Sequence, residues 1–453
     1  MAYRAAIGQG DTDNAADCRA AYNHLSSKYG ASNIATVGFS KTSDVPLTKR
    51  AGVSNFRVAK DYDVLYWSSH GSPVPALNVS DPDLYFESGT NAFNYWRNTS
   101  NKLKVSIFAA CYQFDGTTNR RRWANNIMRK SDIRVMCGYH GSAPGTSKDT
   151  SIVNEFFENI NKGTTGNSVM YSWKIANVAN STSTYLVLVY YGEGRQYYRL
   201  PGFSSKTYPD PDKNTTSIYR YSSANPDGAI VTSTKSIECG TVPYTIEITD
   251  SNCKTISNRE NLSTFSCHLD AKTGSEFFEA RENSSEEVRS AIARKYNSDF
   301  ISMIVNDEIR NSAVIREYDD AMAEIPIEGT EEIEHIIGST TQLFGNYNGI
   351  IMEGNCIASV SDAKGVIALT NQWNKTSIVQ NVDHVDLLHS EKASIEKALM
   401  QQGDNEEAGG SRIGRVRPVY IRKGQQYVLH YELSLENGQT MSVDAKDLER
   451  KLK

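Results

Sequence analysis

The sequence lacks any apolar run that approaches the roughly 20 residues a helix needs to cross a bilayer. Its first residues, Met-Ala-Tyr-Arg-Ala-Ala-Ile-Gly, also lack the apolar stretch of a secretory signal. If Met1 is the native start, we therefore expect a cytoplasmic protein without a membrane span. The alternative is a secreted protein whose leader has been removed from the sequence.

Cysteine is scarce, with seven residues among 453 and no Cys-x-x-Cys pair. An odd number spread over a long chain does not form a disulfide framework, which favours a reducing compartment. The cysteines and histidines of the second half show no metal-ligand spacing: Cys239, Cys253, Cys267, Cys356, His268, His384 and His389. No metal or other cofactor is expected.

The chain also has no excess of either charge, since its formal net charge is −5. It carries no basic stripe with interleaved aromatic residues, so nucleic acid is not expected as a partner. The one dense cationic run, Arg120 to Arg122 beside Trp123, is expected to be the solvated start of a helix. A hydrophobic content of 39% with 22% charged residues is typical of a folded globular protein.

The first 200 residues alternate buried strands with helices. Six apolar runs rich in Val, Ile, Tyr and Phe predict strands at 3–8, 34–39, 63–69, 105–111, 133–139 and 184–191. Helices are predicted after Asp13, ending near Gly30, and over 150–162 and 168–179. Near-continuous apolar strands belong to parallel sheets covered on both faces. We therefore predict an α/β domain of roughly six mainly parallel strands over residues 1–203.

The character of the chain changes after residue 203. Residues 204–235 are rich in Ser, Thr, Asn, Asp and Pro without an apolar period, which predicts a linker and a candidate processing segment. Residues 236–453 are predicted to form an α+β region, with room for two subdomains. Three Asp-Ala-Lys strings, beginning at residues 270, 362 and 444, indicate a repeated strand–turn unit.

Two predicted strands end on reactive side chains. Residues 63–69 lead directly into His70 and Gly71, and residues 105–110 lead into Cys111. Sites in open parallel sheets form at the carboxyl ends of the strands, so we expect these residues at one edge. A thiol at its ordinary pKa of about 8.5 is mostly protonated at neutral pH, and a nearby imidazole activates it.

This order resembles a known group of peptidases. An apolar strand followed by Ser-His-Gly, then an apolar strand followed by Ala-Cys, is similar to caspases, metacaspases, legumains, clostripain, gingipains and the bacterial CHAT-type peptidases. The resemblance covers roughly residues 1–203 and implies a six-stranded α/β fold without a cofactor. It implies His70 as base, Cys111 as nucleophile, and the backbone N–H groups of Gly71 and Cys111 as oxyanion hole.

The cleavage preference stays open. Many relatives carry an acidic or amide residue two positions before the cysteine, where this chain has Ala109. Asp115, Asp149 and Lys174 are candidates for lining the pocket, and we do not choose among them. His140, which also precedes a glycine after an apolar strand, is a rival base or a residue at the rim of the site.

These features predict a cysteine endopeptidase that acts on protein or peptide substrates through a thioester intermediate. Residues 236–453 show no second site, so we expect them to control the first half, through a small-molecule or protein activator or through processing at 204–235. The strand with Asp-Ala-Lys also resembles the PepSY modules that accompany exported peptidases. The alternatives are a catalytically silent caspase-like scaffold that binds or senses, and another thiol enzyme such as an acyltransferase.

Overall fold

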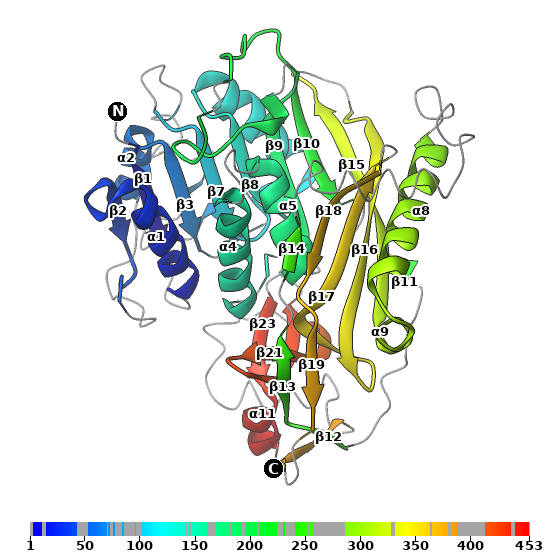
Figure 1. Ribbon diagram of the computed structural model, residues 1–453. Helices are drawn as coiled ribbons and strands as arrows, with labels where there is room; N and C mark the ends of the chain where they lie inside the picture. Colours follow the sequence, from blue (N-terminus) through cyan, green and yellow to red (C-terminus); the bar gives the residue numbers. More distant parts are fainter. Residues whose placement is uncertain are drawn as a thin grey trace. The chain divides into compact units, whose positions relative to one another are not determined.

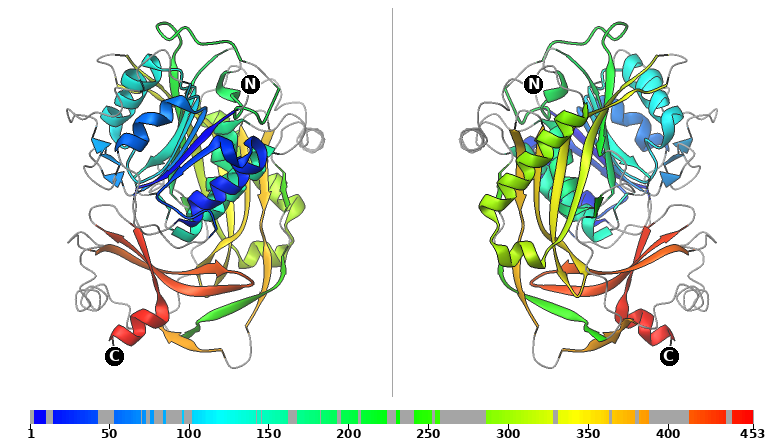
Figure 2. Two further views of the ribbon diagram at one scale, coloured as in Figure 1. Left: turned by 90° about the vertical axis from the view of Figure 1, so that its left-hand side faces the viewer. Right: turned by 90° about the vertical axis from the view of Figure 1, so that its right-hand side faces the viewer.

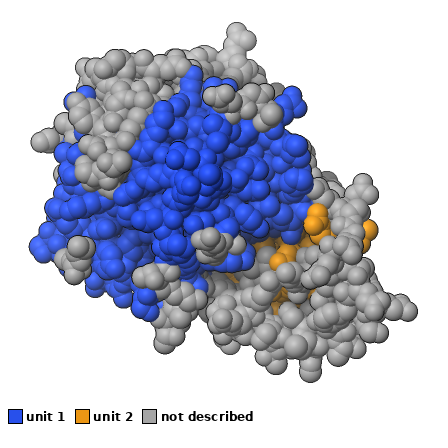
Figure 3. Space-filling view, turned by 90° about the horizontal axis from the view of Figure 1, so that it is seen from above, with its two compact units in different colours: residues 1–177, 182–226, 320–337 blue, residues 178–181, 227–319, 338–453 orange. Residues whose placement is uncertain are grey.

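The computed structural model divides the chain into two compact units that interleave along the sequence (Figure 3). Unit 1 comprises residues 1–177, 182–226 and 320–337, and unit 2 comprises residues 178–181, 227–319 and 338–453. The structure describes residues 3–10, 15–42, 53–69, 71–72, 76–77, 84–85, 96, 102–141, 143–144, 146–161, 168–181, 183–192, 195–205, 208–223, 230–231, 241–251, 254–256, 286–327, 331–362, 365–378, 382–387, 413–435 and 440–452. No helix among them is long and apolar enough to span a membrane.

Unit 1 is an α/β structure built on a mixed sheet. The strands, in spatial order, are β2 (Ile34–Val37), β1 (Ala5–Gln9), β3 (Val64–Ser68), β7 (Val105–Ala109), β8 (Val135–His140), β9 (Thr184–Tyr190), β10 (Ile218–Ser223) and the part of β15 (Val314–Ile325) from residue 320 onward. The first five are parallel to one another, and β9, β10 and β15 each run antiparallel to the preceding neighbour.

Helices cover both faces of this sheet. Figure 2 shows α1 (Ala16–Tyr29) and α4 (Thr146–Asn161) on one face, with α2 (Val53–Val58) and α3 (Gly116–Arg121) on the other. Helix α5 (Val169–Asn180) packs Trp173 against Phe156 of α4. A short separate sheet holds β4 (Gly71–Ser72), β5 (Ala76–Leu77) and β6 (Leu84–Tyr85). Helix α1 ends at Gly30, which has a φ of 84°, as the sequence predicts.

The six predicted strands are all present, and the sheet is wider than expected. They correspond to β1, β2, β3, β7, β8 and β9. The sheet continues past β9 through two antiparallel strands, so the expected six-stranded, mainly parallel sheet describes only part of it. Figure 1 shows β10 and β15 running beside β9. The sequence did not reveal this extension because its two strands come from segments about 100 residues apart in the chain, at 218–223 and 320–325.

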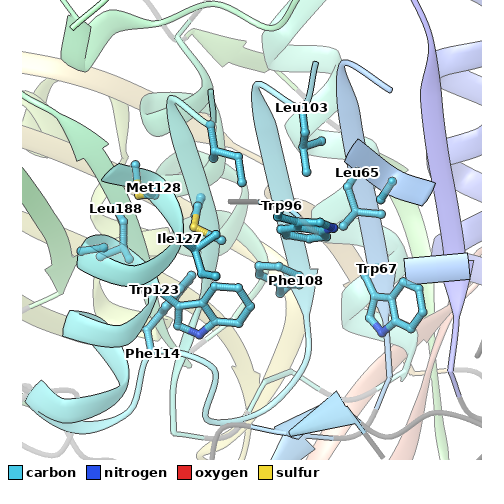
Figure 4. Packing of buried hydrophobic residues seen from close by; sticks show 14 of the residues in the cluster. Leu65, Trp67, Trp96, Leu103, Phe108, Phe114, Trp123, Ile127, Met128 and Leu188 are labelled. Atoms are coloured by element: carbon cyan, nitrogen blue, oxygen red, sulfur yellow. The ribbon is translucent and has the colours of Figure 1, made fainter. Parts of the chain in front are cut away.

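The helix-covered face beside α2 and α3 holds an aromatic core (Figure 4). Trp123 lies in a π-helical turn, Arg122–Ile127, and its ring packs 4.9 Å from that of Phe108 in β7. Phe56 of α2 stacks on Trp96 at 4.4 Å. These large rings are fully buried, and each buried aromatic side chain contributes roughly 1.5–3 kcal/mol to stability. The core therefore fixes the positions of β3 and β7, whose ends carry the predicted site.

Unit 2 is α+β, as predicted for the second half of the chain. Its elements are β11 (Ile230–Val231), β12 (Thr241–Pro243), β13 (Thr245–Ser251), β14 (Lys254–Ile256), α8 (Glu286–Ile304), α9 (Asp307–Ser312), the start of β15, most of β16 (Glu334–Tyr347), β17 (Ile350–Asp362), β18 (Gly365–Asn371), β19 (Asn374–Ser377), β20 (His384–Asp386), β21 (Ile413–Lys423), β22 (Gln426–Leu435), β23 (Thr440–Asp444) and α11 (Ala445–Leu452). Two separate hydrophobic clusters fill it, one beneath α8 and one around β21, β22 and α11.

The Asp-Ala-Lys strings do not share one continuation. Strand β17 ends at Asp362 and the next described element is the antiparallel strand β18, whereas β23 ends at Asp444 and helix α11 follows. The string that begins at residue 270 lies outside the described residues. The strings therefore mark strand ends in two places without forming one repeated unit.

The predicted domain boundaries differ from the observed units. The segment 204–235, predicted as a linker, contains β10, which pairs with both β9 and β15 inside unit 1. Ile218 in this strand is fully buried. Its alternation of buried and half-buried residues was hidden among the polar residues around it. Residues 320–337, predicted to belong to the second domain, also lie in unit 1.

Candidate active site

The carboxyl ends of β3 and β7 meet at one edge of the sheet, as predicted. The two strands are parallel neighbours, with Ser68 opposite Ala109. The pairing continues one step further, because the N–H of Ser69 donates to the carbonyl of Ala109 at 3.3 Å. The chain therefore leaves both strands side by side, directly before Gly71 and Cys111.

Gly71 lies against the backbone of Cys111. A Cβ atom added to Gly71 would lie 2.0 Å from the carbonyl oxygen of Cys111 and 2.9 Å from its carbonyl carbon. Real side chains never approach a backbone atom so closely, so only glycine fits at this position. The structure thus brings together the two residues predicted to supply the oxyanion hole. His70, the predicted base, lies outside the described residues.

The Cys111 thiol has a defined electrostatic partner. Its Sγ accepts a hydrogen bond from the backbone N–H of Ala143 at 3.2 Å, and the residue is 8% exposed. An N–H directed at sulfur stabilises negative charge there, which is the form in which cysteine acts as a nucleophile. Ala143 follows β8, so the segment after this strand closes over the sulfur.

Residues 111–115, which we call the cysteine turn, are held by several hydrogen bonds. Tyr112 has a left-handed backbone (φ 59°), which costs a non-glycine residue roughly 1–2 kcal/mol. The N–H of Tyr112 donates to the carbonyl of Gly141 at 2.7 Å, and the N–H of Phe114 donates to the carbonyl of Tyr139 at 3.1 Å. Strain that persists beside a reactive side chain is typical of functional sites.

Buried side chains fix the turn from within. The amide Nε2 of Gln113 donates to the carbonyl of Cys111 at 3.0 Å, and the indole N–H of Trp123 donates to the carbonyl of Gln113 at 2.8 Å. The rings of Phe114 and Trp123 lie 6.1 Å apart, edge to face (Figure 4). The aromatic core therefore extends directly into the cysteine turn.

His140 ends β8, the neighbour of β7 on the side opposite β3. Its Nδ1 lies 2.9 Å from Oδ1 of Asp115, and both side chains are half-exposed. Burial lowers the pKa of His140, and the charge of Arg120 lowers it further, while Asp115 acts in the opposite direction. The direction of this pKa shift favours the neutral imidazole.

We expect Asp115→Asn to lower the pKa of His140 further, because the lost carboxylate favours the protonated imidazole. The measurement is a titration of the imidazole NMR signals, with the signal of His140 assigned by its loss in His140→Gln. Asp149→Asn, which removes the same charge elsewhere in unit 1, is the matched control. A His140 pKa that stays constant or rises in Asp115→Asn would contradict the contact.

The other candidate pocket residues have different surroundings. Ala109 is 5% exposed at the end of β7, so it is part of the buried sheet. Asp149, in α4, is half-buried. Burial raises the pKa of Tyr139, and the charge of Asp149 raises it further. Lys174 is buried, with its Nζ 2.7 Å from Oδ2 of Asp320. Among all the residues predicted to line the pocket, Asp115 alone belongs to the cysteine turn, residues 111–115.

Four further residues that act on this site were not predicted. Gln113 and Ala143 contact Cys111 directly, and Arg120 donates to the Phe114 carbonyl at 3.2 Å. Arg120 was expected to be solvated, and it is instead buried and paired with Glu332. Gln113 and Arg120 lie close to the cysteine in sequence, but no pattern distinguishes them from surface residues. Glu332 is separated from Arg120 by 212 residues.

The remaining thiols of the described residues are structural. Cys18, Cys137 and Cys356 are fully buried and form no disulfide bond. Burial raises the pKa of Cys137 well above its ordinary value. Cys18 lies in α1 and is part of the buried core. Cys239, Cys253 and Cys267 lie outside the described residues.

No protein-family model matches the sequence, and a search of curated proteins gives no match either. The function is therefore argued from the site itself.

Proposed function

We propose that unit 1 is a caspase-like cysteine endopeptidase with Cys111 as nucleophile and His70 as base. The strand order β2-β1-β3-β7-β8-β9 supports this proposal, because it supplies a six-stranded core with the cysteine at the end of a central strand. The antiparallel strands beyond β9 are then additions to that core.

One observation carries the proposal: the backbone of Gly71 lies against Cys111 at the adjoining ends of two parallel strands, while an N–H from Ala143 points at Sγ. A buried structural cysteine needs neither a glycine in contact with its carbonyl nor a donor on its sulfur. A nucleophile uses both, since the sulfur must carry negative charge and a developing oxyanion must approach backbone N–H groups.

In the proposed reaction His70 takes the proton of the Cys111 thiol, and the resulting thiolate attacks the scissile carbonyl carbon, forming a C–S bond and a tetrahedral oxyanion. The backbone N–H groups of Gly71 and Cys111 stabilise that oxyanion. The C–N bond then breaks, the leaving amine takes a proton from His70, and a thioester remains on Cys111. Water, deprotonated by His70, hydrolyses the thioester and restores the thiol.

We test the function with the purified protein and its Cys111→Ala variant on a peptide library derived from a whole proteome. New termini, identified by mass spectrometry, are expected only with the parent protein, and they give the residue preferred before the cut. Termini within 204–235 would show processing of the chain itself. Transfer of the acyl group to another acceptor would appear as a product mass other than that of hydrolysis. Equal cleavage by both proteins would exclude Cys111 as the nucleophile.

One observation favours the second candidate, a silent scaffold that binds or senses. Cys111 is only 8% exposed, so a substrate carbonyl reaches Sγ only when the surrounding side chains move. A scaffold needs no such access. The two candidates therefore differ in the reactivity of this thiol.

Iodoacetamide labelling at neutral pH separates the candidates. A working site predicts that Cys111 reacts at least about tenfold faster than Cys18, because the thiolate is the reacting species. Cys137, whose pKa burial raises, is the internal control for an inert thiol. Equal labelling of Cys111 and Cys18, read by peptide mass spectrometry, would favour the scaffold.

A further inference from the structure

Glu332 is a buried carboxylate held between two arginines. Its side chain is 2% exposed, and Oε2 lies 2.8 Å from an amino nitrogen of Arg120 and 2.8 Å from Nε of Arg220. The Nε of Arg120 also donates to both carboxylate oxygens at 3.0 Å. Both arginine side chains are 9% exposed. Buried charges require such pairing.

Arg120 connects this cluster to the cysteine turn. While Nε and one amino group bind Glu332, its other amino group, Nη1, donates to the carbonyl of Phe114 at 3.2 Å. Phe114 is three residues from Cys111, and its N–H is bonded to Tyr139 at the end of β8. Arg220 makes no comparable contact, since its remaining amino groups donate to Ser222 at 2.8 Å and to Glu334 at 2.6 Å.

Glu332 reaches this position from a distant part of the chain. Residues 320–337 belong to unit 1, although the chain on both sides of them, 227–319 and 338–453, belongs to unit 2. Residues 320–325 form the last strand of the unit 1 part of the sheet, beside β10, with Arg220 opposite Ala323. The carboxylate is therefore present at the site only when this inserted segment is seated in the sheet.

We propose that Glu332 is a positioning residue for Cys111, which orients Arg120 so that its guanidinium holds the cysteine turn in the reactive arrangement. This inference rests on the proposed function for its consequence in catalysis, and on the contacts alone for its effect on the turn. Control by the second half of the chain then takes a specific form: unit 2, continuous with both ends of the inserted segment, acts by seating or releasing Glu332.

Arg120 and Arg220 bind the same carboxylate, and replacing each of them by lysine separates a positioning role from a role in general stability. Arg120→Lys keeps a positive charge near Glu332, but a single ammonium cannot replace the planar fork that binds both Glu332 and Phe114. Arg220→Lys keeps the same charge and leaves the cysteine turn untouched. We compare hydrogen exchange at the amides of Tyr112, Phe114 and Asp115, which the intact turn protects.

We expect exchange at these three amides to accelerate about tenfold in Arg120→Lys, equivalent to about 1.4 kcal/mol of local stability. The amides of β7 and β8 are expected to keep their parent rates, and Arg220→Lys is expected to leave the turn unchanged. A role in overall stability alone would accelerate exchange throughout unit 1 in both variants. Unchanged exchange in Arg120→Lys would overturn the proposal.

Glu332→Gln completes the test, with Glu334→Gln as the matched control. The first is expected to release the cysteine turn as Arg120→Lys does, and to lower kcat for peptide cleavage with little change in KM. The second removes a contact to Arg220 only and is expected to alter neither. If Glu332→Gln does not fold, the lysine pair decides the outcome.

Exchange and catalysis report separately. If Arg120→Lys exchanges faster than the parent protein and the parent protein cleaves no peptide, the result contradicts the proposed function and supports the positioning role. Normal cleavage by a folded Glu332→Gln protein with a protected turn would contradict the positioning role while leaving the proposed function intact.

Discussion

Glu332→Ala is expected to lower the free energy of unfolding of unit 1 by about 3–5 kcal/mol, the range measured when one partner of a buried ion pair is removed. The substitution leaves two buried guanidinium groups, Arg120 and Arg220, without the carboxylate that lies between them. Neither can reach water without moving the strand or helix that carries it, because each side chain is 9% exposed.

The measurement is chemical denaturation followed by tryptophan fluorescence, since four of the five tryptophans lie in unit 1. Glu334→Ala is the control. Its carboxylate is 41% exposed and, among the described residues, pairs with Arg220, so a loss of about 0–1 kcal/mol is expected. Equal losses in the two variants would show that burial of Glu332 between two arginines adds nothing to stability.

Gly71→Ala is expected to reduce kcat for peptide cleavage at least about a hundredfold, comparable with the loss of one oxyanion donor. The methyl group would lie 2.0 Å from the Cys111 carbonyl oxygen and 2.7 Å from Nε2 of Gln113. The backbone at Gly71 must shift to avoid the Cys111 carbonyl oxygen. The Gly71 N–H then moves away from the position where it is proposed to bind the oxyanion.

A glycine nearby provides the control for Gly71→Ala. Gly116 directly follows the cysteine turn with a φ of 59°, and a Cβ there would meet no atom within 4 Å. Gly116→Ala therefore introduces only left-handed strain, roughly 1–2 kcal/mol, without a collision. It is expected to reduce stability while cleavage by the folded protein persists. Parent-like cleavage by Gly71→Ala would contradict the proposed oxyanion hole.

The strands of unit 1 were predictable because their signal is local. β3, β7, β8 and β9 are fully buried over nearly their whole length, and each gives a mostly apolar run. β10 alternates buried and half-buried residues and carries a buried arginine, Arg220, within a polar stretch. The cation is buried because Glu332 and Glu334 pair with it, and no window of local sequence around β10 contains these two residues.

The candidate site was predictable to the same extent. Two strands ending on His-Gly and Cys predicted that Gly71 and Cys111 meet at one sheet edge, and the register places them in contact. The surroundings of Cys111 were not predictable, because they depend on the left-handed turn at Tyr112 and on contacts from Ala143 and Arg120. Such contacts follow from the path of the chain in space, which the order of residues alone does not specify.

The interleaved chain also bears on the order of events during synthesis. Domains generally fold as units while the chain is synthesised at about 5–20 residues per second. The sheet of unit 1 cannot receive its last strand until residues 320–325 exist, although the segment through Ser223 is made long before. The nascent chain therefore contains Cys111 for an interval in which Glu332 has not yet been translated. If Cys111 is the nucleophile that we propose and Glu332 positions its turn, the nascent chain is expected to be inactive during that interval.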